Sequence, residues 1–143
     1  MAEALLTDRG KGRFRAFSAG SHPKGAVHPM ALNVLKRKGL PTSALRSKSW
    51  DEFSGPQAPP LDVVVTVCDR AAAEMCPAWP GHPTKAHWSV ADPAALEGSP
   101  AERLAAYDEA YRNLDVRIAR LAGLPLDRLD RAALTRELEA VQD

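Results

Sequence analysis

The 143-residue sequence contains only two cysteines, Cys68 and Cys76, and no recognisable export signal. A secretory signal combines a basic segment with a longer apolar one, and residues 1–6 show neither. Because the cytoplasm keeps thiols reduced, a cysteine pair there is more often catalytic, redox-active or metal-binding than structural. The sequence therefore predicts a soluble cytoplasmic protein that uses its thiols chemically.

Charge of one sign and long apolar runs are also scarce. The 19 basic residues nearly balance the 18 acidic ones, which gives no electrostatic attraction for nucleic acid or a membrane surface. The apolar run at 63–67 is far shorter than the roughly 20 residues that cross a bilayer. Neither glycine cluster, at 10–12 or 19–21, matches a Walker loop or a dinucleotide fingerprint. We therefore expect no nucleic-acid partner, no membrane and no cofactor.

What the sequence does contain is an alternation of strand and helix patterns. The β-branched run at 61–67 has no polar alternation, which predicts a parallel strand that is buried on both faces. From residue 101 the apolar residues recur every three or four positions, which predicts a long amphipathic helix. We expect further strands at 13–18 and 85–90, and helices at 1–6, 29–38, 49–53, 71–75 and 127–140. This order predicts an α/β fold with a mostly parallel sheet.

The residues most open to a chemical role follow the predicted strand 61–67. Cys68 lies at its carboxyl end, where α/β proteins place their chemistry, so its thiol is either activated or simply a small buried residue. Cys76, eight positions on, either forms a reversible disulfide with Cys68 or is a second core thiol. Asp92 precedes a proline and is either a general acid or a turn aspartate.

Two other sets of polar residues are weaker candidates. Cys68, Cys76, His82 and His87 are zinc-ligand types, but they lack the tight spacing of a zinc motif. His87 is more simply a hydrogen-bonded core histidine beside a packed tryptophan. The run of cations and serines at 46–49 is either an anion site or a solvated turn.

Taken together, these segments resemble the low-molecular-weight protein tyrosine phosphatase superfamily, and within it the arsenate reductases coupled to thioredoxin. The spacing Cys-x7-Cys-Pro, followed by His-Trp and Asp-Pro, is the most specific part. The matching segments are 1–6, 18–20, 46–49, 51–53, 65–69, 76–77, 79–81, 87–88 and 92–93. The resemblance implies a phosphatase-like three-layer sandwich with a parallel sheet over residues 1–122, and a carboxyl-terminal helical extension at 123–143.

The resemblance also implies roles for three residues. Cys68 would displace arsenite by attacking the sulfur of the nucleophile, Cys76 would then form a disulfide with Cys68, and Asp92 would protonate the leaving oxygen. Thioredoxin or a similar dithiol would reduce that disulfide, and arsenate would be the substrate of the complete protein. The gap between Cys68 and Cys76 is one residue longer than the thioredoxin-coupled pattern, which leaves the reductant open.

One part of the family pattern is missing from the sequence. The family places its nucleophile in a Cys-x5-Arg loop after a central strand, and neither cysteine here has arginine six positions later. We therefore expect a chain that lacks the first central strand and is inactive alone, with about fifteen to twenty preceding codons that encode the loop. The alternatives are a non-catalytic partner-binding module that keeps the fold, and a tyrosine phosphatase of the same fold.

Overall fold

Two short parallel strands form the sheet of the computed structural model, which describes residues 1–74 and 79–142. Strand β1 (Val63–Thr66) pairs with β2 (Thr84–His87) in a register that runs from Val63 opposite Thr84 to Thr66 opposite His87. Helix α3 (Asp69–Ala73) follows β1 directly. The predicted α/β class and the parallel pairing are confirmed, with both strands shorter than predicted.

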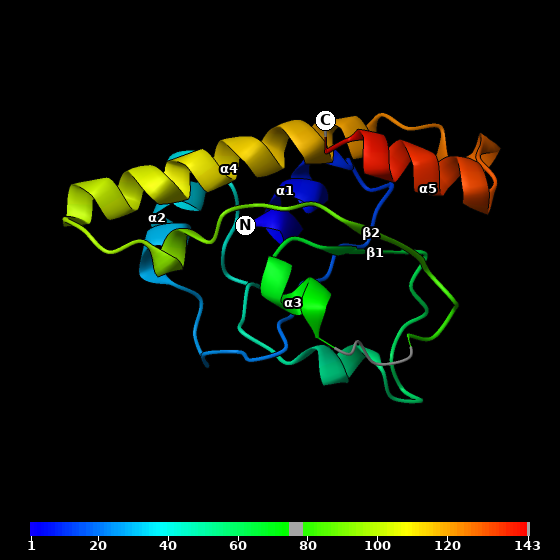
Figure 1. Cartoon of the computed structure of the whole chain (residues 1–143), viewed down its shortest axis with the longest axis horizontal. Helices are drawn as coiled ribbons and strands as arrows, with labels where there is room; N and C mark the ends of the chain where they lie inside the picture. Colours follow the sequence, from blue (N-terminus) through cyan, green and yellow to red (C-terminus); the bar gives the residue numbers. More distant parts are fainter. Residues whose placement is uncertain (75–78, 143) are drawn as a thin grey trace.

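Helices lie on both sides of this sheet, as Figure 1 shows. Helices α1 (Ala2–Arg9), α4 (Pro100–Ala122) and α5 (Arg131–Ala140) cover one face, and α3 lies on the other. Helix α2 (Pro29–Arg37) packs against α4. This arrangement is the expected three-layer sandwich, and it leaves the carboxyl ends of β1 and β2 at one edge.

Helix α4 forms the centre of the core because its sequence supplies both a cap and an apolar stripe. The Ser99 hydroxyl accepts a hydrogen bond from the Glu102 amide at 3.2 Å, and Pro100 occupies the first helical turn. The buried residues of α4 are Tyr107, Ala110, Tyr111, Leu114, Ile118 and Leu121. The predicted amphipathic helix is therefore confirmed, and it begins one residue earlier than predicted.

The carboxyl-terminal part of the chain packs against the same core. Leu138 of α5 is fully buried and Val141 is nearly so, within the cluster that contains Leu5 and Leu114. The Trp88 indole, just after β2, donates a hydrogen bond to the Leu138 carbonyl at 2.8 Å. Helix α5 thus holds the end of β2 in place, and the short 3-10 helix η3 (Leu126–Arg128) precedes α5 in the chain.

Two sequence predictions about strands are wrong. Residues 13–18, predicted to be a strand, form none, and the chain makes only an isolated bridge just after them, between Gly20 and Ser49. All four residues of β1 are half-buried rather than buried on both faces. Both differences have one cause. Among the described residues β1 pairs with β2 alone, so no strand lies beside residues 13–18 or along the free edge of β1.

Candidate functional site

Cys68 lies between β1 and α3, as predicted from the sequence. It occupies the N-cap position of α3 with an extended backbone, and its carbonyl accepts a hydrogen bond from the Ala72 amide at 3.1 Å. Its thiol is free and half-buried. The helix begins at Asp69 rather than at residue 71, so Cys68 is adjacent to the first helical turn.

The second predicted thiol, Cys76, lies outside the residues that the structure describes. Helix α3 ends at Ala73, three positions before it, and Trp79 resumes the described chain three positions after it. The predicted pairing of Cys68 with Cys76 therefore stays a prediction.

Asp92 lies at the same edge of the sheet as Cys68. The Val90 amide donates to the Val67 carbonyl at 3.1 Å, so the segments that follow the two strands run side by side. Asp92 is exposed, and its Oδ1 accepts from the Ala94 amide at 2.9 Å, which caps the 3-10 helix η2 (Pro93–Ala95). This contact is the one expected of a turn aspartate, and it occupies one of the two carboxylate oxygens of Asp92.

A buried tyrosine lies within electrostatic reach of Asp92. Burial raises the pKa of Tyr107, and the Asp92 carboxylate raises it further. The Tyr107 ring stacks on the His28 ring with centroids 4.8 Å apart. The raised pKa of Tyr107 keeps its phenol in the neutral form at the pH of the cell.

Beside Cys68 the structure places a hydrogen-bonded network that we call the His87 cluster: Thr66, Asp69, His87 and Ser89. His87 Nδ1 lies 2.7 Å from the Thr66 hydroxyl, and its Nε2 lies 2.7 Å from Asp69 Oδ1. The Ser89 hydroxyl donates to the same Asp69 oxygen at 2.9 Å. The hydrogen bonds from His87 and Ser89 lower the pKa of Asp69, and the bond from His87 has the larger effect.

Sequence reasoning found only one member of this cluster, His87, which is hydrogen-bonded as predicted but half-buried rather than in the core. It missed Thr66, Asp69 and Ser89. The sequence did contain a signal for Asp69 and Ser89. Asp69 directly follows Cys68, and residues 87 and 89 share one side of an extended chain. The zinc hypothesis gains no support, because both ring nitrogens of His87 already have partners. Among the described residues, no group of three or more His, Cys, Asp or Glu side chains could hold a metal ion.

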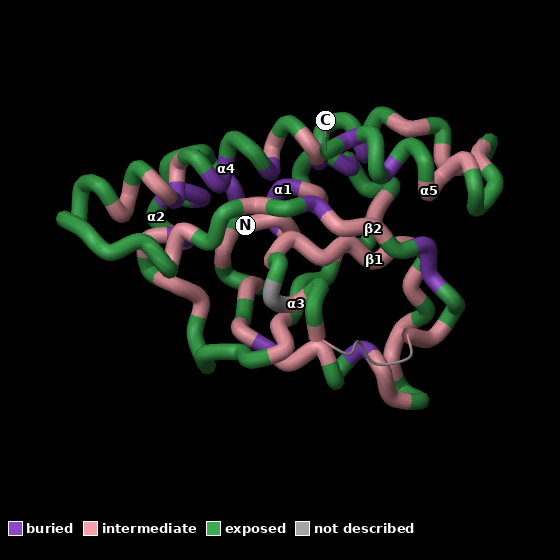
Figure 2. Tube along the Cα trace, in the orientation of Figure 1, coloured by how far each residue is buried: buried purple, intermediate pink, exposed green. Residues whose placement is uncertain are grey.

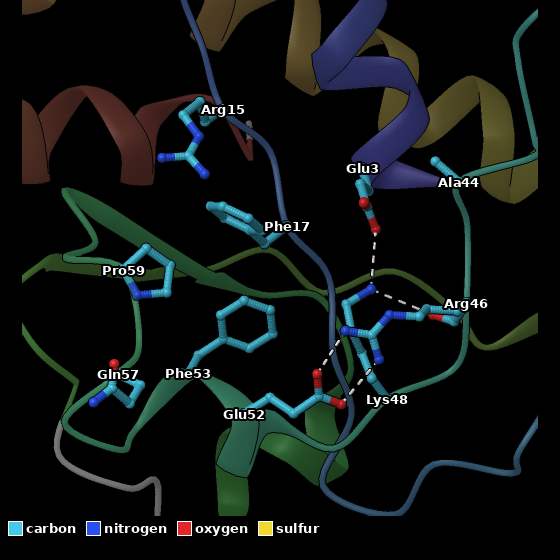
Figure 3. Close-up of a pocket in the computed structure, with 10 residues that line it drawn as sticks. All are labelled: Glu3, Arg15, Phe17, Ala44, Arg46, Lys48, Glu52, Phe53, Gln57 and Pro59. Atoms are coloured by element: carbon cyan, nitrogen blue, oxygen red, sulfur yellow. Dashed lines mark hydrogen bonds and ion pairs between the residues drawn. The ribbon is translucent and has the colours of Figure 1, made fainter.

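A separate cavity of about 510 Å³ opens near the start of α1 (Figure 3). On one side Phe17 and Phe53 pack with ring centroids 5.3 Å apart. Its other lining residues are Glu3, Arg15, Ala44, Arg46, Lys48, Glu52, Gln57 and Pro59. Neither Cys68 nor Asp92 lines it, so the cavity and the predicted thiol chemistry occupy different places.

The cations at 46–48 are paired with carboxylates (Figure 3). Arg46 makes two hydrogen bonds to Glu52, at 2.6 and 3.0 Å, and this pairing lowers the pKa of Glu52. Lys48 is only 8% exposed, and its Nζ lies 3.5 Å from Glu3 Oε2 and 3.3 Å from the Arg46 carbonyl. This segment is therefore neither a simple solvated turn nor an open anion site.

Comparison with known proteins places this fold in a family. The family described as low molecular weight phosphotyrosine protein phosphatase matches residues 1–139, and the chain belongs to that family. Among its relatives, an arsenate reductase of Halalkalibacterium halodurans is 34% identical over 106 residues, which cover 74% of this chain and 73% of that protein. An arsenate reductase of Bacillus subtilis is 30% identical over 122 residues, which cover 85% of this chain and 84% of that protein.

A solved structure shows the same fold. The arsenate reductase from Archaeoglobus fulgidus superimposes with a TM-score of 0.62 at 22% identity, over 86% of this chain and 88% of that one. The described residues include no helix with the length and apolar content that spanning a membrane requires.

Proposed function

We propose that this chain takes part in the reduction of arsenate to arsenite, as a thiol relay that runs from Cys68 to Cys76. The observation that carries the proposal is a free, half-exposed thiol at the carboxyl end of β1, in a chain whose relatives are named arsenate reductases. A reducing cytoplasm would keep that thiol available.

The relay conserves atoms and electrons. Arsenate takes two electrons from two thiols, and the products are arsenite, water and one disulfide. The thiol that first attacks arsenic would come from outside these 143 residues, which contain no Cys-x5-Arg loop. Cys68 would attack the sulfur bound to arsenic and release arsenite, and Cys76 would then attack the Cys68 sulfur and free the first thiol.

Three further parts complete the proposal. Asp92, at the edge shared with Cys68, would protonate the leaving oxygen, and its Oδ2 is the oxygen that does not cap η2. A dithiol reductant such as thioredoxin would return the disulfide to two thiols. Without a nucleophile loop, the 143 residues alone would exchange disulfides and would not turn over arsenate.

The test is complementation of an arsenate-sensitive strain by the gene with its preceding in-frame codons. We expect growth on arsenate, and loss of growth in Cys68→Ser and in Cys76→Ser. Hydrolysis of an aryl phosphate by the same proteins is the control, because it needs no resolving thiol and reports an intact fold. Growth unaffected by both substitutions would overturn the relay and favour a phosphatase.

A further inference from the structure

Tyr107 of α4 is a buried tyrosine that the proposed relay does not use. The residue is only 3% exposed. Its hydroxyl oxygen is shielded from water and makes no hydrogen bond with any residue that the structure describes. A buried hydroxyl without a partner is unfavourable, and most such groups in folded proteins have one. The Tyr107 hydroxyl is therefore an unused donor, which an acceptor close to it would bind.

Packing fixes the position of this hydroxyl. The Tyr107 ring stacks on the His28 ring, with centroids 4.8 Å apart and planes inclined by 28°. His28 is itself held at the N-cap of α2, where its Nδ1 accepts from the Met30 amide at 3.1 Å. A buried ring that is stacked on another ring keeps its hydroxyl in one place, so the partner must lie close to that place.

The Asp92 carboxylate lies near the hydroxyl. The 3-10 helix η2, which Asp92 caps, packs against α4, and its Ala94 packs against the core cluster that contains Tyr107. After burial, the charge of Asp92 is the largest cause of the raised pKa of Tyr107. Because Coulomb interactions weaken with distance, this effect agrees with the packing in bringing the carboxylate close to the phenol.

One oxygen of Asp92 is available to accept. Oδ1 accepts from the Ala94 amide at 2.9 Å, whereas Oδ2 makes no hydrogen bond within the described part of the chain. Arg103, four residues before Tyr107, is a rival donor, since its Nε is also buried without a partner among the described residues. The Arg103 side chain is only half-buried, however, and water can reach its other N–H groups. Tyr107 has a single donor, so it gains more from Oδ2.

We propose that the Tyr107 hydroxyl donates a hydrogen bond to Asp92 Oδ2, which makes Tyr107 a positioning residue for the acid of the proposed reaction. The inference rests on the proposed function for the role of Asp92. When Asp92 protonates the leaving oxygen, its O–H bond breaks, a new O–H bond forms on the leaving group, and negative charge develops on the carboxylate. A hydrogen bond strengthens as its acceptor becomes charged. Tyr107 therefore stabilises the transition state more than the ground state, while it keeps its own proton.

A double-mutant cycle in the 143-residue chain tests the hydrogen bond. Urea denaturation at neutral pH gives the unfolding equilibrium constant of the wild type, Tyr107→Phe, Asp92→Ala and the double variant. The loss of the η2 cap accompanies Asp92→Ala with or without the hydroxyl, so it cancels in the cycle. Tyr107→Phe should raise the constant about two- to tenfold more in the wild type than in Asp92→Ala.

The matched control is the other tyrosine of α4. Tyr111 is 7% exposed, and its pKa is raised by burial and then by Asp115, without a contribution from Asp92. Tyr111→Phe should therefore change the constant equally with and without the Asp92 carboxylate. A coupling as large as that of Tyr107 would overturn the inference, because it would show a general effect of the Asp92 charge.

The positioning role is tested in the complete protein, made with its preceding codons. A general acid matters more as the leaving group becomes more basic. Tyr107→Phe should therefore slow hydrolysis of phenyl phosphate about two- to tenfold, and that of 4-nitrophenyl phosphate, whose leaving group is less basic, by less than about twofold. A merely structural role of Tyr107 would slow both reactions equally.

The outcomes separate this inference from the proposed function. Additive effects of Tyr107→Phe and Asp92→Ala would overturn the hydrogen bond and leave the relay untouched. Equal slowing of the two phosphates would overturn the positioning role alone. A complete protein without arsenate or phosphate turnover would overturn the proposed function and that role with it, whereas the cycle would still decide the hydrogen bond. If Tyr107→Phe failed to fold, a Tyr107 pKa left unchanged by Asp92→Ala, measured by NMR titration of its ring carbons, would overturn the bond.

Discussion

The two faces of the sheet differ in how completely their residues are buried (Figure 2). On the face covered by α1, α4 and α5, Leu5 and Leu138 are fully buried and Ile118 is 3% exposed. On the other side, α3 is a five-residue helix whose Ala72 and Ala73 are exposed. The predicted chemistry lies where packing is lighter, because Cys68 joins β1 to α3.

This difference in burial indicates that the two faces of the sheet have different roles. Close packing resists movement, so the helical face fixes the positions of β1 and β2. Segments with few buried contacts open at lower cost in free energy, so the proposed chemistry at Cys68 would lie in the part of the described structure that opens more readily. If so, the two faces should also differ in how much their residues contribute to the free energy of unfolding.

The largest effect is expected on the helical face, at Leu138. Leu138→Ala should lower the free energy of unfolding by about 2–5 kcal/mol, because it removes a fully buried side chain and leaves a cavity. The matched control is Leu96→Ala at a leucine that is 42% exposed, where little change is expected. Urea denaturation of the full chain measures both. Equal losses would mean that α5 is not part of the core.

The same contrast explains which parts of the fold could be predicted from the sequence. Helix α4 was predictable because its cap and apolar stripe are local signals. The strand expected at 13–18 was wrong, because a strand needs a partner that no local pattern reveals. Cys68 was singled out as a residue that follows a strand, and Asp92 as one that precedes a proline. The His87 cluster was not, because it depends on the register that sets Thr66 opposite His87.

The second effect concerns two neighbouring cations with different burial. Lys48→Met should cost about 1–3 kcal/mol, because it leaves the Glu3 carboxylate largely buried without its cation. Arg46→Met is the control, since the Arg46–Glu52 pair is exposed and should matter far less. Thermal unfolding at low and high salt separates them. A larger loss from Arg46→Met would contradict the importance of burial.

A third effect is expected where α5 meets β2. The last carbonyls of a helix lack partners within it, and the Trp88 indole donates to one of them, at Leu138. Trp88→Phe should cost about 1–3 kcal/mol through the carbonyl left unpaired, whereas Trp50→Phe, away from α5, is the control. Hydrogen exchange should show faster opening of α5 in the first variant alone. Unchanged exchange in α5 would mean that this bond does not hold the helix.

The smallest effect is a pH dependence on the lighter face. The pKa of Asp69 is lowered by the His87 and Ser89 hydrogen bonds, so the ionised carboxylate favours the folded form. This contribution is fully present above the ordinary aspartate pKa of about 3.9 and is lost as the pH falls through the lowered value. NMR titration of the Asp69 carboxyl carbon measures it. Ser89→Ala should move the pKa part of the way back, and His87→Gln further, in line with the order of their contributions. A pKa at the ordinary value in the wild type would show that the cluster is open in solution, and that the lighter face is looser than its hydrogen bonds indicate.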